Sequence, residues 1–302
     1  MVAANLALYD LAWTHGPKKP VELDCEFSAG IAEAAARGDY LEAARMRVDR
    51  TPTGMRATTD HGAVLEGMFT EDSEHWRMRV PDGSAERGLA FEIEDLLSLV
   101  LTTGWRRAGW VPLHAAAVTD GVRGILVCAA SGGGKTTFML ALVRAGWKAL
   151  GDDKLLLRSD GAGSFIVGIK HMLNVDPSVD AWFPEIGDLR GLPEYSAWTP
   201  KRRIGLSSLW PDSPAFAMRP TTVISLERRP GPGAMSAEEM DPAATIGTML
   251  RQTVIPRDPD EARWITRELA ACARGTRGIR LVVGDQAYVD PSSIDAFARQ
   301  LS

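Results

Sequence analysis

One stretch of the sequence limits the possible folds more than any other: "GILVCAASGGGKTTFMLALVRAGWKALGDD", residues 124–153. The apolar run from Gly124 to Cys128 predicts a buried strand. The apolar pattern that starts near Lys135 predicts a helix that ends at Gly146. Three successive glycines between them allow backbone conformations that side chains would prevent. We therefore expect a strand, a tight glycine turn and a helix in direct succession.

A glycine turn that opens a helix is typical of a phosphate-binding site, because backbone N–H groups and the positive end of the helix dipole meet there. We expect Lys135 to reach the terminal phosphates of ATP and the Thr136 hydroxyl to bind Mg²⁺. Ala129 replaces the first glycine of the usual pattern G-x-x-x-x-G-K-[S/T], and so small a residue predicts an altered turn rather than a lost site. The structural alternative is a glycine-rich helix cap with an incidental lysine. The predicted nucleotide-binding residues are Ala130, Ser131, Gly132, Gly133, Gly134, Lys135, Thr136 and Thr137.

Two adjacent acids, Asp152 and Asp153, follow the next predicted strand, "WKALG". A strand–helix–strand crossover makes both strands run in the same direction, and ligands bind at the carboxyl ends of such strands. The glycine turn and the acids should therefore share one edge of the sheet. In phosphoryl transfer, one carboxylate there can hold the metal and another can accept the proton of the attacking hydroxyl. The alternative is a pair that only positions Mg²⁺ and water in an ATPase or switch.

His114 lies in the apolar run "LHAAAV", which "TDGVRG" joins to the strand before the glycines. Such a turn predicts an antiparallel hairpin. Pairing Val118 with Gly124 places His114 opposite Cys128, at the mouth of the glycine turn. A histidine in an apolar strand usually has a structural role. This position also allows it to orient Asp152 or to contact the transferred phosphoryl group.

The rest of the chain predicts a β-rich N-terminal region, residues 1–110, and an α/β catalytic domain, residues 111–302. Alternating runs over residues 46–80 indicate short antiparallel strands, and residues 88–109 have the spacing of an amphipathic helix. Further strands and two helical patterns, residues 243–254 and 259–274, follow the glycine turn. Residues 176–220 are rich in Pro, Trp and Gly and predict a long irregular segment, in which a basic run at residues 201–203 is interpreted as a solvated loop.

Composition excludes several classes of protein. The formal net charge of −5 gives no reason to expect nucleic acid or an anionic membrane as a partner. The three cysteines are far apart and match neither a metal site nor a disulfide framework. The sequence has no signal-peptide pattern and no apolar run long enough to cross a bilayer. We therefore expect a cytoplasmic location.

Residues 113–157 resemble the catalytic core of the HPr kinase/phosphorylase family and its HPr-kinase-like relatives, a P-loop fold similar to phosphoenolpyruvate carboxykinase. In that family a His-bearing strand precedes the glycine loop, and a helix then leads to an Asp-Asp pair. The resemblance implies Asp152 as the base toward a serine hydroxyl, Asp153 near the metal and His114 supporting Asp152. It implies Lys135 and Thr136 on phosphate and Mg²⁺.

Outside that stretch the family pattern departs. Its E-x-R-G segment has only a displaced counterpart in "DLRG", residues 188–191, and its arginine-bearing recognition segment is absent. The resemblance is therefore to the diverged relatives, some of which are found with peptide-modification pathways and phosphorylate a serine of a precursor peptide.

Two functions follow. The first is an ATP- and Mg²⁺-dependent kinase that transfers a phosphoryl group to a hydroxyl of a peptide, protein or small metabolite, with Asp152, His114 and Lys135 as catalytic residues and Thr136 and Asp153 as metal ligands. The second is a nucleotide-dependent binding module or ATPase switch without an acceptor. The identity of the acceptor and the oligomeric state stay open.

Overall fold

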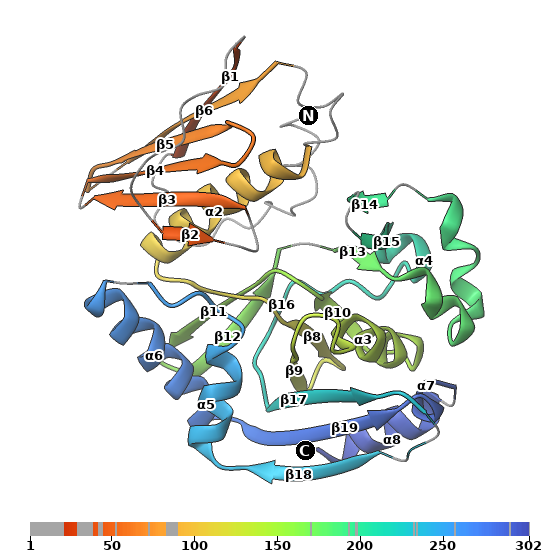
Figure 1. Ribbon diagram of the computed structural model, residues 1–302. Helices are drawn as coiled ribbons and strands as arrows, with labels where there is room; N and C mark the ends of the chain where they lie inside the picture. The colour runs from red at the N-terminus through yellow and green to blue at the C-terminus, as the bar shows by residue number, and fades with distance from the viewer. Residues whose placement is uncertain are drawn as a thin grey trace. The chain divides into compact units, whose positions relative to one another are not determined.

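The computed structural model describes residues 21–301 except for 29–38, 42–44, 52, 72, 83–89, 170, 193, 197–198, 232, 234, 257 and 290 (Figure 1). The described residues form two compact units, and the chain passes from the first to the second after Gly109. Strands and helices alternate along the second unit, so the expected α/β class is confirmed.

The first unit is one six-stranded sheet covered by a helix. The sheet has the order β1-β6-β5-β4-β3-β2, in which β1 is parallel to β6 and the other neighbours are antiparallel. Alternate residues of its strands are buried with Ile93, Leu96, Leu97 and Val100 of α2, so the predicted strands and amphipathic helix are confirmed. The elements are β1 (Val21–Ser28), β2 (Asp39–Leu41), β3 (Met46–Thr51), β4 (Gly54–Thr59), β5 (Val64–Phe69), β6 (Glu74–Pro81) and α2 (Ala90–Arg107).

A second six-stranded sheet, of order β10-β8-β9-β17-β19-β18, forms the centre of the second unit. The strands β9, β17 and β19 are parallel neighbours. Strand β8 pairs antiparallel with both β9 and β10, so β9 and β10 run in the same direction, as the sequence predicted. The elements are β8 (Ala116–Thr119), β9 (Gly124–Cys128), α3 (Lys135–Arg144), β10 (Lys148–Gly151), β17 (Thr222–Arg229), β18 (Ser236–Met240) and β19 (Arg277–Gly284).

Both faces of the central sheet are covered, which explains why β9 is apolar at every position. Ile125 and Val127 pack into a core with α3, α7 (Gln286–Val289) and α8 (Pro291–Gln300). Leu126 and Cys128 face the opposite core with the helices α5 (Pro242–Leu250) and α6 (Pro259–Arg274). The strand that leads into the glycines is therefore held rigidly from two sides.

Two smaller sheets complete the second unit. One has the order β16-β12-β11-β7 and the other the order β13-β15-β14. The prediction of an irregular segment over residues 176–220 is wrong in part, because it contains the seven-residue strand β15 and several short helices. The elements are β7 (Val111–Leu113), β11 (Leu155–Asp160), β12 (Gly163–Gly168), β13 (Met172–Val175), η2 (Pro177–Ala181), η3 (Pro184–Ile186), η4 (Leu189–Gly191), β14 (Glu194–Ser196), β15 (Thr199–Gly205), α4 (Leu206–Leu209) and β16 (Ala217–Met218).

Within the described residues, none of the helices combines the length and the apolar character that a bilayer crossing demands.

Candidate nucleotide-binding and catalytic site

The glycine loop, residues 129–134, has a backbone that only glycine adopts easily. Gly132 and Gly134 have φ angles of 73° and 90°, in the left-handed region. A Cβ on Gly133 would lie 2.9 Å from the Cβ of Ala129 and 2.9 Å from the carbonyl oxygen of Ala130, too close for either contact. Arg45 is the one described non-glycine residue with positive φ, so Ala129 sits where a side chain is tolerated. The loop therefore closes tightly without the first glycine of the usual pattern.

Helix α3 begins directly after this loop, with Gly134 as its N-cap. No side chain caps the helix, so the backbone N–H groups of its first turn are available to a ligand. The body of the helix, from Thr137 to Val143, is buried. The expected sequence of strand, glycine turn and helix is thus confirmed.

Lys135 lies folded into the site and is only 7% exposed. Its Nζ donates to the carbonyl oxygen of Ala129 at 3.1 Å. Burial lowers the pKa of Lys135, whereas the charge of Asp153 opposes that shift and the like charge of Lys201 adds to it. The sequence suggested a solvated loop for Lys201, but this residue belongs to the strand β15, which pairs with β13.

The hydroxyl of Thr136 donates to Oδ2 of Asp152 at 2.7 Å. Asp152 follows β10 and is 5% exposed. The bond joins the first turn of α3 to the end of the strand that α3 leads to. The predicted meeting of the glycine loop and the acids at one edge of the sheet is therefore confirmed. The carboxylate beside the threonine belongs to Asp152, where the sequence suggested Asp153.

His114 contacts Asp153, with 2.6 Å between Nδ1 and Oδ1. The expected contact was with Asp152. The expected register was also wrong by one residue, because Val118 pairs with Ile125 rather than with Gly124. His114 lies in a break between β7, which pairs with β11, and β8, which pairs with β9. Because His114 lies in this break, it is outside the strand pairing and can face Asp153.

Gln252, which sequence reasoning missed, connects this break to the glycine loop. Its amide nitrogen, assigned from the surrounding acceptors, donates to the carbonyl oxygens of Ala129 at 3.1 Å and of His114 at 2.7 Å. The backbone N–H of His114 in turn donates to the carbonyl oxygen of Gln252 at 2.7 Å. Gln252 is 7% exposed and follows α5. No local signal identifies it, because it reaches the loop only through the packing of α5.

These groups fit a nucleotide with its metal. The glycine loop offers backbone N–H donors in a turn that a Cβ at residue 133 would fill, and Lys135 adds a positive charge. Thr136 and Asp152 supply a hydroxyl and a carboxylate oxygen at one point. Mg²⁺ prefers oxygen ligands and is usually held by one or two carboxylates together with substrate phosphates. The donor set is therefore the kind that holds a Mg²⁺–triphosphate.

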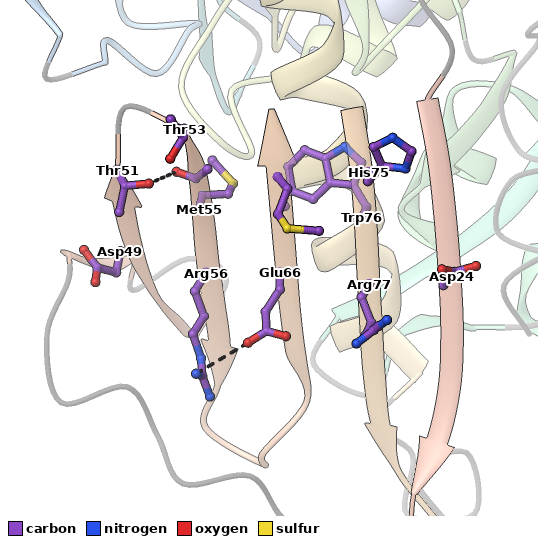
Figure 2. A pocket seen from close by; sticks show the side chains of 13 residues that line it. Asp24, Asp49, Thr51, Thr53, Met55, Arg56, Glu66, His75, Trp76 and Arg77 are labelled. Carbon is purple, nitrogen blue, oxygen red and sulfur yellow. Dashed lines mark hydrogen bonds and ion pairs between the residues drawn. The ribbon is translucent and has the colours of Figure 1, made fainter. Parts of the chain in front are cut away.

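The first unit has a separate pocket of about 500 Å³ on its sheet (Figure 2). Charged side chains of both signs line it, and Figure 2 shows Arg56 of β4 beside Glu66 of β5, an ion pair of 3.5 Å. The indole of Trp76 forms part of the pocket although the residue is only 2% exposed. The pocket contains none of the residues predicted for the site.

No family model and no curated protein matches this chain. Among solved structures it is similar to the Hpr(Ser) kinase/phosphatase from Coxiella burnetii, with 12% sequence identity and a TM-score of 0.35 over 63% of this chain and 96% of that chain. Similarity at this level does not assign the chain to a family.

Proposed function

We propose that the protein is an ATP- and Mg²⁺-dependent kinase that transfers the terminal phosphoryl group to a hydroxyl. The observation that supports this most directly is the arrangement of two separate acid contacts beside one glycine loop: Thr136 with Asp152, and His114 with Asp153. An ATPase switch needs one such acid to position metal and water. A second carboxylate with its own histidine partner suits a hydroxyl acceptor that must lose a proton.

In this proposal the glycine loop and Lys135 bind the phosphates, and Thr136 and Asp152 hold the magnesium ion. When bound, the ion neutralises charge on the terminal phosphates. The hydrogen bond between Thr136 and Asp152 orients both oxygens before the nucleotide arrives. Lys135, which is buried against the loop, stabilises negative charge on the transferring group more effectively than a solvated lysine does.

The contacts lead us to exchange the roles that the sequence suggested for the two acids. Asp152 is almost fully buried and already accepts from Thr136, which suits a metal ligand. The side chain of Asp153 is 18% exposed and that of His114 is 56% exposed, so this pair is the one that an acceptor can approach. We assign Asp153 as the base. The acceptor's O–H proton moves to the carboxylate of Asp153 while the new O–P bond forms and the bond from the terminal phosphorus to the bridging oxygen breaks.

We further propose a serine of a peptide or protein as the acceptor, with a biosynthetic precursor peptide as one form of it. The support is the resemblance of residues 113–157 to HPr-kinase-like relatives. A small serine-like metabolite is the alternative acceptor, since the same base and phosphate groups serve either molecule.

Incubation with ATP labelled at the γ-phosphate, under single-turnover conditions, tests the proposal. The protein is mixed with labelled Mg-ATP and with serine-containing peptides, and in parallel with serine and related metabolites. Label on a peptide or metabolite supports the kinase. Release of inorganic phosphate alone, with every acceptor present, would favour the ATPase switch instead.

A further inference from the structure

Arg228, which the sequence did not single out, lies beside the glycine loop. The three parallel strands of the central sheet end at the same edge, and β17 extends past its last pair with β9, Ser225 with Cys128. Arg228 follows three residues later, where β17 and β19 run together toward α7 (Figure 1). A Cβ on Gly134 would lie 3.4 Å from both Cβ and Cδ of Arg228. The aliphatic part of the Arg228 side chain therefore lies next to the N-cap of α3.

The guanidinium group of Arg228 is held from two sides. Its Nε and Nη2 donate to Oδ1 of Asp285 at 3.0 Å and 2.9 Å. Its carbon lies 4.5 Å from the ring centroid of Trp182, a cation–π distance. Asp285 is itself fixed, because its Oδ2 accepts from the backbone N–H of Gly231 at 2.9 Å. An arginine restrained in this way loses little side-chain entropy when it binds an anion.

A buried hydroxyl at the same place lacks a partner. Tyr288 is 0% exposed, and its hydroxyl makes no hydrogen bond to any residue that the structure describes. This oxygen lies 3.7 Å from the position of a Cβ on Gly134. Burial raises the pKa of Tyr288, which keeps the group neutral and able to donate. A buried donor without an acceptor destabilises a folded protein, so its presence here points to a ligand.

Trp182 and Tyr288 are hydrogen-bonded to α3, the helix that follows the glycine loop. Arg144, in the last turn of α3, donates to the carbonyl oxygens of Trp182 and Tyr288, both at 2.6 Å. Trp182 and Tyr288 are therefore positioned by α3 itself. The sheet order β10-β8-β9-β17 puts the two acids, which follow β10, and Arg228 of β17 on opposite sides of β9, the strand that leads into the glycine loop.

We propose that Arg228, clamped by Asp285 and Trp182, contacts the phosphates of a bound nucleoside triphosphate from the β17 side of the glycine loop, with the Tyr288 hydroxyl as a neighbouring donor. This inference rests on the proposed nucleotide site. A phosphate oxygen at the first turn of α3 gives the guanidinium a further acceptor and gives the tyrosine hydroxyl its missing one. A purely structural role for Arg228 would be to hold the ends of β17 and β19 together.

Calorimetric titration of the full chain with Mg-ATP separates the two roles. Arg228→Gln should weaken binding about tenfold or more, the effect of losing a hydrogen bond to a charged group. The matched control is Arg229→Gln, the next residue on the same strand. Its side chain is 68% exposed and pairs with Glu227. The control removes the same charge and should change binding by less than about twofold.

Tyr288→Phe adds a second test, because a change in Mg-ATP binding without a loss of stability would not be expected if this tyrosine had only a structural role. Removing a hydroxyl without a partner should leave the thermal unfolding midpoint unchanged or higher, while Mg-ATP binding weakens about three- to tenfold. If Arg228→Gln does not fold, Arg228→Lys replaces it, because lysine keeps the charge but loses the fork that holds Asp285.

The outcomes are distinct. Binding by the wild type and the Arg229 variant, with weaker binding by the Arg228 and Tyr288 variants, supports the inference. Equal binding by all four proteins overturns the inference and leaves the proposed function intact. A wild type that binds no Mg-ATP overturns both.

Discussion

At the scale of single residues, Gly133 is the glycine whose missing side chain matters most to the loop. Gly132 and Gly134 need their positive φ angles, but Gly133 needs space. A Cβ there would lie 2.9 Å from both the Ala129 side chain and the Ala130 carbonyl oxygen. The loop tolerates alanine at residue 129 partly because residue 133 has no side chain to meet it.

Gly133→Ala should therefore open the glycine loop. Overpacking of this kind costs about 1–3 kcal/mol, and a cost of that size in the bound loop lowers Mg-ATP affinity about 5- to 150-fold. Gly161→Ala is the matched control, because a Cβ on Gly161 meets no atom within 4 Å. Calorimetric titration of both variants measures the effect. Equal affinities would show that the loop does not bind the phosphates.

Complementary substitutions distinguish the roles of Asp152 and Asp153. Asp153→Asn should lower the rate of phosphoryl transfer about 10²- to 10⁴-fold while Mg-ATP binding changes little, because it removes the proposed proton acceptor. Asp152→Asn should weaken Mg-ATP binding about tenfold or more, because it removes the charge of the proposed metal ligand. Single-turnover transfer and calorimetry measure the two effects. The opposite pattern would restore the roles that the sequence suggested.

At the scale of secondary structure elements, the site depends on a break between two strands. The chain leaves β7 at Leu113 and enters β8 at Ala116, and each strand joins a different sheet. His114 lies in this break and reaches Asp153. Gln252, behind α5, holds the break and the start of the glycine loop together. The position of the histidine is therefore fixed by packing far along the chain.

Gln252→Leu should destabilise the protein by about 1–3 kcal/mol, because it takes the amide donor from the carbonyl oxygen of His114 and leaves Lys135 as the donor to Ala129. Transfer should also slow, since the break positions His114. Gln286→Leu, at an exposed residue of α7, is the control. Urea unfolding measures the stabilities. A Gln252 variant as stable as the control would show that this amide does not hold the loop.

Local patterns in the sequence predict the strand, glycine turn and helix because each depends on neighbouring residues. The burial of β9 on two faces, Ile125 toward one core and Leu126 toward the other, explains its unbroken apolar run. The break at His114 cannot be found in this way, because β7 pairs with β11, more than 40 residues away. Arg228 could have been predicted only with one further piece of information. Ligands bind at the carboxyl ends of parallel strands. This rule would have indicated Arg228 as a site residue if the pairing of β17 with β9 had been known.

At the scale of the whole molecule, the two units have separate cores. The cysteines are distributed over both units and differ in burial. Cys25 is exposed in the first unit, whereas Cys128 and Cys272 are buried in one core of the second. Burial raises the pKa of both buried thiols from 9.0 to about 12. The native state keeps these protons where the unfolded chain loses them, so stability should fall as pH rises from about 9 toward 12.

Cys25 is exposed, although burial of part of the thiol and the charge of Asp24 raise its pKa. We therefore expect Cys25 to be the first thiol of the native chain to react with a small alkylating reagent near pH 8. All three cysteines should react after unfolding in urea. Mass spectrometry of the labelled peptides identifies them. Rapid labelling of Cys128 in the native protein would contradict a buried β9.

The central claim is that the glycine loop, Lys135 and the acid pair form one site for a Mg²⁺–triphosphate. Titration of the protein with Mg-ATP tests it most directly, with Lys135→Met beside Lys148→Met, an exposed lysine of β10. The account predicts one bound nucleotide per chain, an unchanged affinity in the Lys148 variant and a loss of about tenfold to hundredfold in the Lys135 variant. Absence of binding by the wild type, or equal affinity in both variants, would contradict it.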